Sequence, residues 1–234
     1  NGVIKKTKLE AYSRPRQNGV NAITIREDDQ VIQVRLTNGD SQIIMANKHG
    51  RAIRFHESTV REMGRNATGV RGMTLDGKDD EVIGMICMKD LDKETIMVVS
   101  EQGYGKRSEI EDYRITNRGG KGVKCYKITE KTGDVIGARA VNEDNEVMLI
   151  TTEGIIIRIA CADISILGRI TSGVKLINLT EGVTVASVAK VRDKEEKDTN
   201  AQQAAVEITD SAETEESDQP TDQETQDENR GEEE

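Results

Sequence analysis

Basic side chains recur in this sequence about every fifty residues, in three separate registers. The first register is basic in all four repeats and contains Lys6, Arg54, Arg107 and Arg158. The other two are basic in three repeats of four. The second register contains Arg71, Lys124 and Lys175, and the third contains Arg65, Arg118 and Arg169. Regularly spaced cations suit a polyanion, and duplex DNA carries a negative charge about every 1.7 Å of its axis. Phosphate contacts position a duplex without reading bases, so we expect sequence-independent binding.

Surface Lys and Arg are most often solvated residues with no partner, and that is the plain structural alternative. The second and third registers also have exceptions, because the first repeat carries Asn21 and Pro15 at those positions. Three coincident basic registers in a body near charge balance nevertheless favour function. We therefore expect a cationic track, in which equivalent residues project from equivalent places in the fold.

One short stretch combines glycines with two cations: Arg118-Gly119-Gly120-Lys121-Gly122. Glycine lets backbone amides approach a phosphate closely, and Arg118 and Lys121 supply charge, so we place the stretch in the DNA-binding surface. A tight hairpin turn is the more common meaning of such a loop. The stretch is not a nucleotide-binding P-loop, because no Ser or Thr follows the lysine and the upstream glycine is missing.

The basic registers rest on internal repeats. Turn-like glycines recur at Gly2, Gly50, Gly103 and Gly154, and Gly-Val pairs begin at Gly19, Gly69, Gly122 and Gly173. Within each repeat, β-branched runs of four to eight residues are separated by Gly, Asn and Asp, which predicts short strands. In the second repeat these runs are 43–46, 52–55, 70–75 and 82–88. Four strands in about fifty residues are typical of propeller blades.

The sequence thus predicts an all-β, propeller-like domain over residues 1–191, with repeats near 1–46, 47–99, 100–150 and 151–191. The first repeat is incomplete, because the others have an apolar strand just before their hairpin glycine and this one has none. With no initial Met either, we expect the sequence to be the C-terminal part of a longer protein.

Charge separates residues 192–234 from this body. This tail holds 17 acidic and four basic residues, a net charge of -13, whereas residues 1–191 carry 29 basic and 26 acidic residues, or +3. Large apolar residues are nearly absent from the tail, so we expect it to be disordered. A solvating tail is the plain interpretation. The sharper hypothesis is that it competes with DNA for the cationic track.

Composition excludes several other classes. No apolar run approaches the ~18 residues of a membrane span, and no secretory leader is visible, so we expect a cytoplasmic protein with no membrane partner. Cys87, Cys125 and Cys161 are too few and too isolated for a disulfide framework or a zinc site, and we expect reduced, packed thiols. His49 and His56 lack further ligand candidates, so we expect no metal.

At the level of motifs, the repeats resemble the C-terminal β-pinwheel domain of the A subunit of DNA gyrase. The stretches that carry the resemblance are Asn1–Lys6, Arg51–Phe55, Met63–Gly72, Gln102–Arg107 and Ile164–Gly173. It covers essentially all of residues 1–191, whereas the tail matches in character only. Arg118–Gly122 matches the last five residues of the family's heptapeptide Gln-Arg-Arg-Gly-Gly-Lys-Gly, but Thr116 and Asn117 do not. The heptapeptide belongs to the first blade, so this stretch is a related loop of a later blade.

The resemblance implies a blade array whose neighbours exchange a strand and whose basic rim wraps duplex DNA. It also implies membership of an ATP-dependent type II topoisomerase that introduces negative supercoils. Its nucleophilic tyrosine, its use of ATP and Mg²⁺, and its contacts with the gyrase B subunit and a second A subunit belong to other regions. We therefore expect no catalytic residue and no cofactor in this chain.

Two alternatives remain open at this point. The corresponding domain in the A subunit of topoisomerase IV is closely related, although its blades are generally fewer or degenerate, and the four regular repeats favour gyrase. The other is a propeller-type protein-interaction scaffold whose basic residues are incidental.

Overall fold

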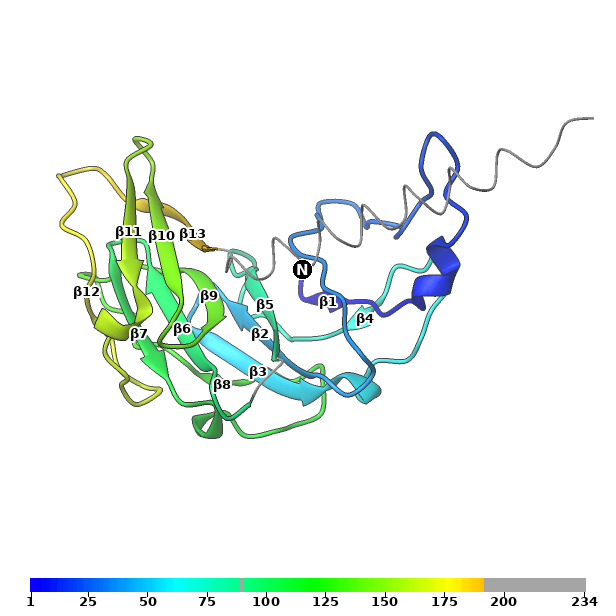
Figure 1. Cartoon of the computed structure of the whole chain (residues 1–234), viewed down its shortest axis with the longest axis horizontal. Coiled ribbons are helices and arrows are strands. Elements are labelled where there is room, and N and C mark those ends of the chain that lie inside the picture. Colours follow the sequence, from blue (N-terminus) through cyan, green and yellow to red (C-terminus); the bar gives the residue numbers. More distant parts are fainter. Residues whose placement is uncertain (89–90, 192–234) are drawn as a thin grey trace, which may run out of the picture. The chain divides into compact units, whose positions relative to one another are not determined.

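The computed structural model describes residues 1–88 and 91–191, and the predicted disorder of the tail lies outside these residues. Their regular structure consists of short strands and single 3₁₀ turns (Figure 1). The strands are β1 (Val3–Ile4), β2 (Gln42–Asn47), β3 (Arg51–His56), β4 (Val70–Arg71), β5 (Val82–Met88), β6 (Thr95–Ser100), β7 (Tyr104–Ser108), β8 (Val123–Lys124), β9 (Val135–Val141), β10 (Glu146–Thr151), β11 (Ile156–Ala160), β12 (Val174–Lys175) and β13 (Val185–Lys190). The turns are η1 (Leu9–Tyr12), η2 (Glu57–Thr59), η3 (Ile110–Asp112) and η4 (Cys161–Asp163). The all-β prediction is confirmed.

The strands form antiparallel sheets that repeat one pattern. The second, third and fourth repeats each begin with their central strand, five residues before the boundary expected from the sequence. In the second repeat β2 lies between β3 and β5, in the third β6 lies between β7 and β9, and in the fourth β10 lies between β11 and β13. The hairpin glycines predicted from the sequence make the tight turns before β1, β3, β7 and β11. All four have positive φ, between 70° and 81°, a conformation that side chains other than glycine's rarely adopt.

In the second, third and fourth repeats, the third predicted run does not join its own sheet. Only two of its residues form a strand, and that strand pairs with the preceding repeat: β4 with β1, β8 with β3 and β12 with β7. We call β4, β8 and β12 the exchanged strands. The exchange implied by the resemblance is therefore present, and each complete four-stranded sheet draws strands from two consecutive repeats.

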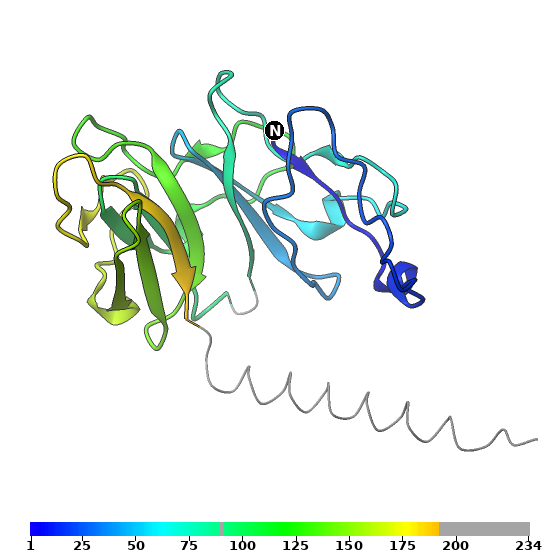
Figure 2. The ribbon, with the colours of Figure 1, turned by 90° about the horizontal axis from the view of Figure 1, so that it is seen from above.

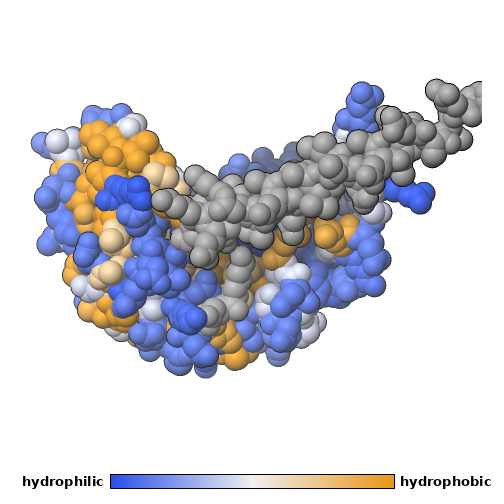
Figure 3. All heavy atoms as spheres, viewed as in Figure 1, coloured by the Kyte–Doolittle hydropathy of each residue, from blue (hydrophilic) through white to orange (hydrophobic). Residues whose placement is uncertain are grey.

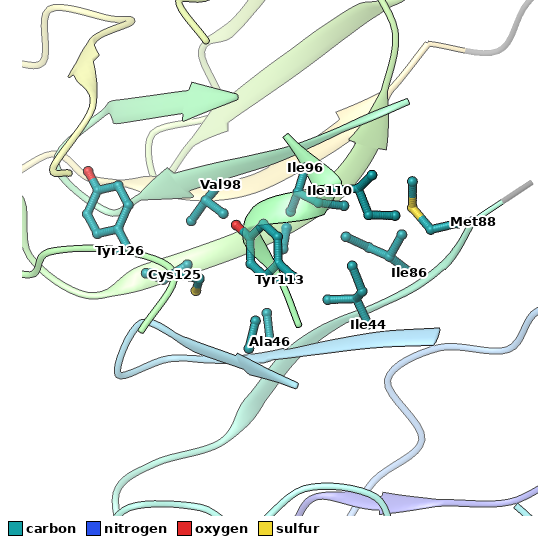
Figure 4. Close-up of a cluster of buried hydrophobic side chains, with 13 residues drawn as sticks. Ile44, Ala46, Ile86, Met88, Ile96, Val98, Ile110, Tyr113, Cys125 and Tyr126 are labelled. Atoms are coloured by element: carbon teal, nitrogen blue, oxygen red, sulfur yellow. The ribbon is translucent and has the colours of Figure 1, made fainter. Parts of the chain in front are cut away.

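The hydrophobic core is divided among successive sheets. One buried cluster joins Ile44 and Ile86 of the second repeat to Val98, Tyr113 and Tyr126 of the third (Figure 4). Two similar clusters join the first repeat to the second and the third to the fourth. Since β2 and β6 lie between neighbours on both faces, they are buried along almost their whole length. Such strands read as continuous apolar runs, which is the pattern the sequence shows.

The first repeat departs from the pattern of the others. Residues 31–36 occupy the position of β5, β9 and β13 but form no strand, and Val34 and Leu36 are 75% and 79% exposed. In the other repeats this strand pairs with β2, β6 or β10. Among residues 1–41, no strand occupies the place that β2, β6 and β10 have in the other repeats.

Each exchanged strand approaches its acceptor so closely that only glycine fits in front of it. A Cβ on Gly122 would stand 2.3 Å from the carbonyl oxygen of Ala52, and Gly122 has a φ of +72°. We expect Gly122→Ala to destabilise the fold by about 3–5 kcal/mol, because the backbone strain adds to a clash with backbone atoms.

Gly39→Ala is the matched control, because Gly39 also has positive φ but nothing lies within 4 Å of its Cβ position. It should cost only about 1–2 kcal/mol of backbone strain. Urea unfolding followed by circular dichroism measures both values, and equal losses would contradict the assigned close approach.

Candidate nucleic-acid interface

The first basic register does not project from the fold as a track. Arg107 is 3% exposed, and its Nε donates to the carbonyl oxygen of Ile164 at 2.9 Å, at the end of η4. Arg54 Nη1 likewise donates to the carbonyl oxygens of Ile110, the first residue of η3, and of Tyr113, which follows η3, at 3.0 and 3.2 Å. The expectation that these side chains face outward is corrected by this geometry.

Lys6 occupies the same position in the first repeat. Its Nζ donates to the carbonyl oxygen of Glu57 at 3.1 Å, on η2, and lies 3.7 Å from the Glu57 carboxylate. Burial opposes ionisation of Glu57, but hydrogen bonds from the Ser41 amide, the Thr37 hydroxyl and the Gly39 amide outweigh it and lower its pKa. Lys6, Arg54 and Arg107 thus each clasp the 3₁₀ turn of the following repeat. We call these three residues the clasp.

Arg158 is the fourth member of this register and lies in the last repeat. Its side chain is 61% exposed and pairs with Glu146 of the neighbouring strand β10. Residues 1–191 contain no further repeat whose turn it could reach, so the same sequence position has a different environment.

The second register lies on the exchanged strands and does face outward. Arg71, Lys124 and Lys175 are the second residues of β4, β8 and β12, and all three are exposed. Successive residues of a strand face opposite sides, and the preceding residues Val70 and Val123 are half-buried, whereas Val174 is 38% exposed. These three cations are therefore accessible to a partner, and their part in DNA binding stays a prediction.

The third register connects the second from repeat to repeat. Arg118 Nη1 donates to the carbonyl oxygen of Arg71 at 2.8 Å, and its Nε donates to that of Thr59 at 2.9 Å. In the next repeat, Arg169 Nη1 donates to the carbonyl oxygen of Lys124. Arg71, Arg118, Lys124, Arg169 and Lys175 therefore follow one another across three repeats, and we call this series the basic edge.

Arg65, the remaining member of the third register, is half-buried. Its carbonyl oxygen accepts a hydrogen bond from Lys5 Nζ, as that of Arg169 does from Lys106. Among the described residues its guanidinium makes no hydrogen bond like those of Arg118 and Arg169, so we leave it out of the basic edge.

The glycine-rich loop packs against the second repeat. The Gly119 amide donates to the carbonyl oxygen of Gly72 at 2.6 Å, and the Gly120 carbonyl oxygen accepts from the Thr74 amide at 2.9 Å. Lys121 remains 58% exposed and lies 3.1 Å from Asp76, whose pKa it lowers by hydrogen bonding and by its charge. The Gly119 amide is thus already occupied, and Gly120 and Lys121 are the exposed members of the loop.

Sequence reasoning missed a buried lysine beneath the basic edge. Lys106 is fully buried, and its Nζ donates to the carbonyl oxygens of Gly168 and Arg169, at 2.8 and 2.5 Å. Burial lowers its pKa to about 8. Lys5 is the equivalent residue of the first repeat, and its Nζ likewise donates to the carbonyl oxygen of Arg65. The other two repeats have Ile53 and Ile157 at this position, so the sequence shows no basic register that would have indicated Lys106.

Other predicted features concern thiols, metals and membranes. Cys125 and Cys161 are buried and Cys87 is half-buried, all three as free thiols, and burial raises the pKa of Cys125 to about 12. Among residues 1–88 and 91–191, no three His, Cys, Asp or Glu side chains cluster as a metal site would require. The same residues contain no helix that is long and apolar enough to cross a membrane.

Strand-exchanged antiparallel sheets in tandem, with cations along the exchanged strands, define a propeller-type repeat domain of the β-pinwheel kind. The family model of the DNA gyrase C-terminal domain, a β-propeller, matches residues 1–38, 41–87, 94–142 and 145–192. The four matched segments correspond to the four repeats, and the chain belongs to this family.

Individual relatives agree with this assignment. The chain is 46% identical over 199 residues to the A subunit of DNA gyrase from Staphylococcus aureus strain NCTC 8325, covering 85% of this chain and 22% of that protein. The same protein of strain MRSA252 is 44% identical over 205 residues, covering 88% and 23%. The chain thus spans less than a quarter of the length of these relatives.

Two solved structures are similar at 29% identity. The crystal structure of the C-terminal domain of DNA topoisomerase IV matches with a TM-score of 0.79, covering 88% of this chain and 64% of that one. The structure of a DNA gyrase A C-terminal domain matches with a TM-score of 0.68, covering 75% and 59%. Of the relatives named here, the staphylococcal gyrase proteins are more similar to this chain in sequence than the two solved structures, at 46% and 44% identity against 29%.

The clasp predicts unequal roles for two arginines of one register. Arg107→Met should destabilise the fold by about 2–4 kcal/mol, because it removes a buried charged donor and leaves the Ile164 carbonyl oxygen without it. Arg158→Met, the matched control, should change stability by less than about 0.5 kcal/mol, since an exposed ion pair contributes little. Thermal unfolding separates the two, and a loss for Arg158→Met as large as that for Arg107→Met would refute the distinction.

Proposed function

We propose that the chain binds duplex DNA along the basic edge, without base specificity, as the DNA-wrapping module of a type II topoisomerase. The observation that carries the proposal is the succession of Arg71, Arg118, Lys124, Arg169 and Lys175. Arg118 and Arg169 each donate to the backbone beside the preceding exposed cation. Repeated strands thereby hold phosphate-binding groups at repeated places, as a duplex requires.

Wrapping adds an energetic demand to binding. Bending a site of about 20–30 base pairs costs about 1–6 kcal/mol, so many phosphate contacts must share the cost. Lys121 extends the basic edge, and Arg114 and Lys121 line a shallow pocket of about 240 Å³ beside β3. These groups add contact points where the loop meets the exchanged strand β8.

Family membership supports the wider role. We infer that the chain acts in the A subunit of a bacterial gyrase that uses ATP and Mg²⁺ through other regions to supercoil DNA in the cytoplasm. The gyrase B subunit and a second A subunit would be contacted through those regions. In this proposal the chain itself contributes no catalytic group.

The topoisomerase IV alternative predicts the same basic edge and differs in the reaction of the parent enzyme. The propeller-type interaction scaffold predicts a different behaviour, because its cations would be incidental. Such a scaffold would bind DNA weakly at physiological salt and with little salt dependence, whereas the basic edge predicts steep dependence.

Charge reversal tests the placement of the interface. Arg71, Lys124 and Lys175 changed together to Glu should weaken DNA binding strongly and make the salt dependence shallower. The slope of log K against log salt is negative, and its magnitude should decrease by about 0.9 for each phosphate that the protein no longer neutralises. Fluorescence anisotropy with a labelled duplex at several salt concentrations gives both quantities.

Arg26, Arg35 and Lys78 provide the control, because they are exposed cations outside the exchanged strands. Reversing them changes the net charge equally and should leave most of the affinity. Equal losses from the two triple variants would show that net charge, and not the basic edge, governs binding.

The acidic tail is proposed to compete with DNA for the same cations. Its net charge of -13 opposes the +3 of residues 1–191. Removing residues 192–234 should raise DNA affinity, most strongly at low salt, because screening weakens the tail's attraction to the body. Unchanged affinity and an unchanged salt slope in the truncated chain would exclude the competition.

A further inference from the structure

Lys106 is a buried cation that belongs to none of the three basic registers. Hydrophilic residues colour much of the visible surface blue in Figure 3, whereas Lys106 is 0% exposed. It is the only buried lysine among residues 1–88 and 91–191. Because an ammonium group loses its hydration on burial, it needs polar partners inside the fold. The identity of those partners shows what this lysine holds in place.

The hydrogen-bond partners of Lys106 lie on residues 167–171 of the fourth repeat, which we call the Arg169 loop. The lysine Nζ donates to the carbonyl oxygens of Gly168 and Arg169, at 2.8 and 2.5 Å. It also lies 5.8 Å from the centre of the Tyr126 ring. Two carbonyl dipoles and one aromatic face thus compensate the charge, so the ammonium group and the loop fix each other's position.

The Arg169 loop connects this buried lysine to the basic edge. Arg169 Nη1 donates to the carbonyl oxygen of Lys124, on the exchanged strand β8. The third and fourth repeats lie side by side here, with the yellow strand β12 beside the green strand β7 (Figure 2). Among the described residues, only the hydrogen bonds from Lys106 tie the backbone of residues 168–170 to the third repeat. The position of the Arg169 guanidinium therefore depends on Lys106.

The equivalent loop of the third repeat is held in a different way. Ile53 stands in place of the lysine, with its Cδ1 3.6 Å from the Cβ position of Gly120. The Gly119 amide donates to the carbonyl oxygen of Gly72 at 2.6 Å, and Gly119 has a φ of +90°. Ile170 occupies the place of Gly119 in the Arg169 loop and does not have positive φ, a conformation that β-branched residues avoid. The Arg169 loop therefore follows another path and needs another anchor.

The interface between the first and second repeats follows the same rule. Its loop has Asn66-Ala67 where the third repeat has the pair Gly119-Gly120. Lys5, the equivalent of Lys106, lies at this interface, and its Nζ donates to the carbonyl oxygen of Arg65. A lysine thus accompanies both loops that lack the glycine pair, and an isoleucine accompanies the loop that has it.

We infer that Lys106 is a positioning residue for DNA binding, whose ammonium group holds the Arg169 loop so that Arg169 stands beside Lys124 on the basic edge. The inference rests on the proposed function, because Arg169 contacts phosphate only if DNA lies along the basic edge. Lys106 is fully buried and touches no phosphate itself. Its loss therefore weakens DNA binding through the displacement of Arg169.

Lys106→Ile tests the inference, because the second repeat already accommodates Ile at this position. DNA binding by the full chain is measured by fluorescence anisotropy at several salt concentrations. The magnitude of the slope of log K against log salt should decrease by about 0.9, the value for one phosphate, and Arg169→Gln should have the same effect. The double variant should show no further decrease, because both changes remove one and the same contact.

A rescue variant separates positioning from a general loss of structure. Adding Ile170→Gly and Thr171→Gly to Lys106→Ile rebuilds the combination found in the third repeat, and it should restore the wild-type slope. Lys5→Ile is the matched control, since it removes an equal charge at the equivalent position, beside an arginine outside the basic edge. It should leave the slope unchanged.

Arginine modification follows the loop in the absence of DNA. A dicarbonyl reagent, read out by mass spectrometry, should modify Arg169 faster in Lys106→Ile than in the wild type, because the guanidinium leaves the carbonyl oxygen of Lys124. Arg118, at the same place in the preceding loop, should react equally in both proteins. The buried Arg107 should react in neither, which shows that the fold is intact.

Several results would overturn the positioning role. They are an unchanged salt slope or unchanged Arg169 reactivity in Lys106→Ile, additive losses in the double variant, a rescue variant that does not recover, and modification of Arg107. A wild-type chain whose DNA binding hardly depends on salt would instead contradict the proposed function, and the role of Lys106 in DNA binding with it.

Discussion

Strand exchange between consecutive repeats is the interaction on which the rest of this structure depends. It requires a glycine of positive φ in front of each exchanged strand, because any side chain there meets the acceptor backbone. It also requires the hairpin glycine of the acceptor, whose carbonyl oxygen receives an amide from just beyond the exchanged strand, as Gly103 does from Leu176. These two glycine series recur together because they form the two sides of one contact.

The exchange also separates the cations by role. A basic residue on the acceptor strand points along the neighbouring repeat, where Arg54 and Arg107 satisfy the carbonyl oxygens that end a 3₁₀ turn. A basic residue on the exchanged strand lies at the edge of the sheet and faces water. The same type of side chain therefore holds repeats together in one register and supplies surface charge in another. The role depends on which strand carries the residue and on whether a following repeat covers it, as the difference between Arg107 and Arg158 shows.

Much of this architecture could be predicted from the sequence. β5 coincides with its predicted run, and β2 and β3 extend one residue beyond theirs at each end, since β-branched runs bounded by glycine have few other solutions. The exchange itself came from the family resemblance, because a Val-Lys dipeptide carries no sign of which sheet it joins. The periodicity also makes Arg107 and Arg158 equivalent positions. It does not show that Arg107 is buried by the following repeat, whereas no repeat within residues 1–191 follows Arg158. Residues 31–36 have the apolar pattern of a strand but form none. A strand forms only where a neighbouring strand supplies its hydrogen bonds, and the local sequence does not show whether that neighbour is present.

The central claim is that DNA lies along the basic edge and not over the cations in general. Lysine acylation read out by mass spectrometry, with and without a bound duplex, tests it directly. If DNA lies along the basic edge, it protects Lys124 and Lys175, the exposed Lys78 is modified equally in both states, and the buried Lys106 is modified in neither. Protection of Lys78 with continued modification of Lys124 and Lys175 would contradict it.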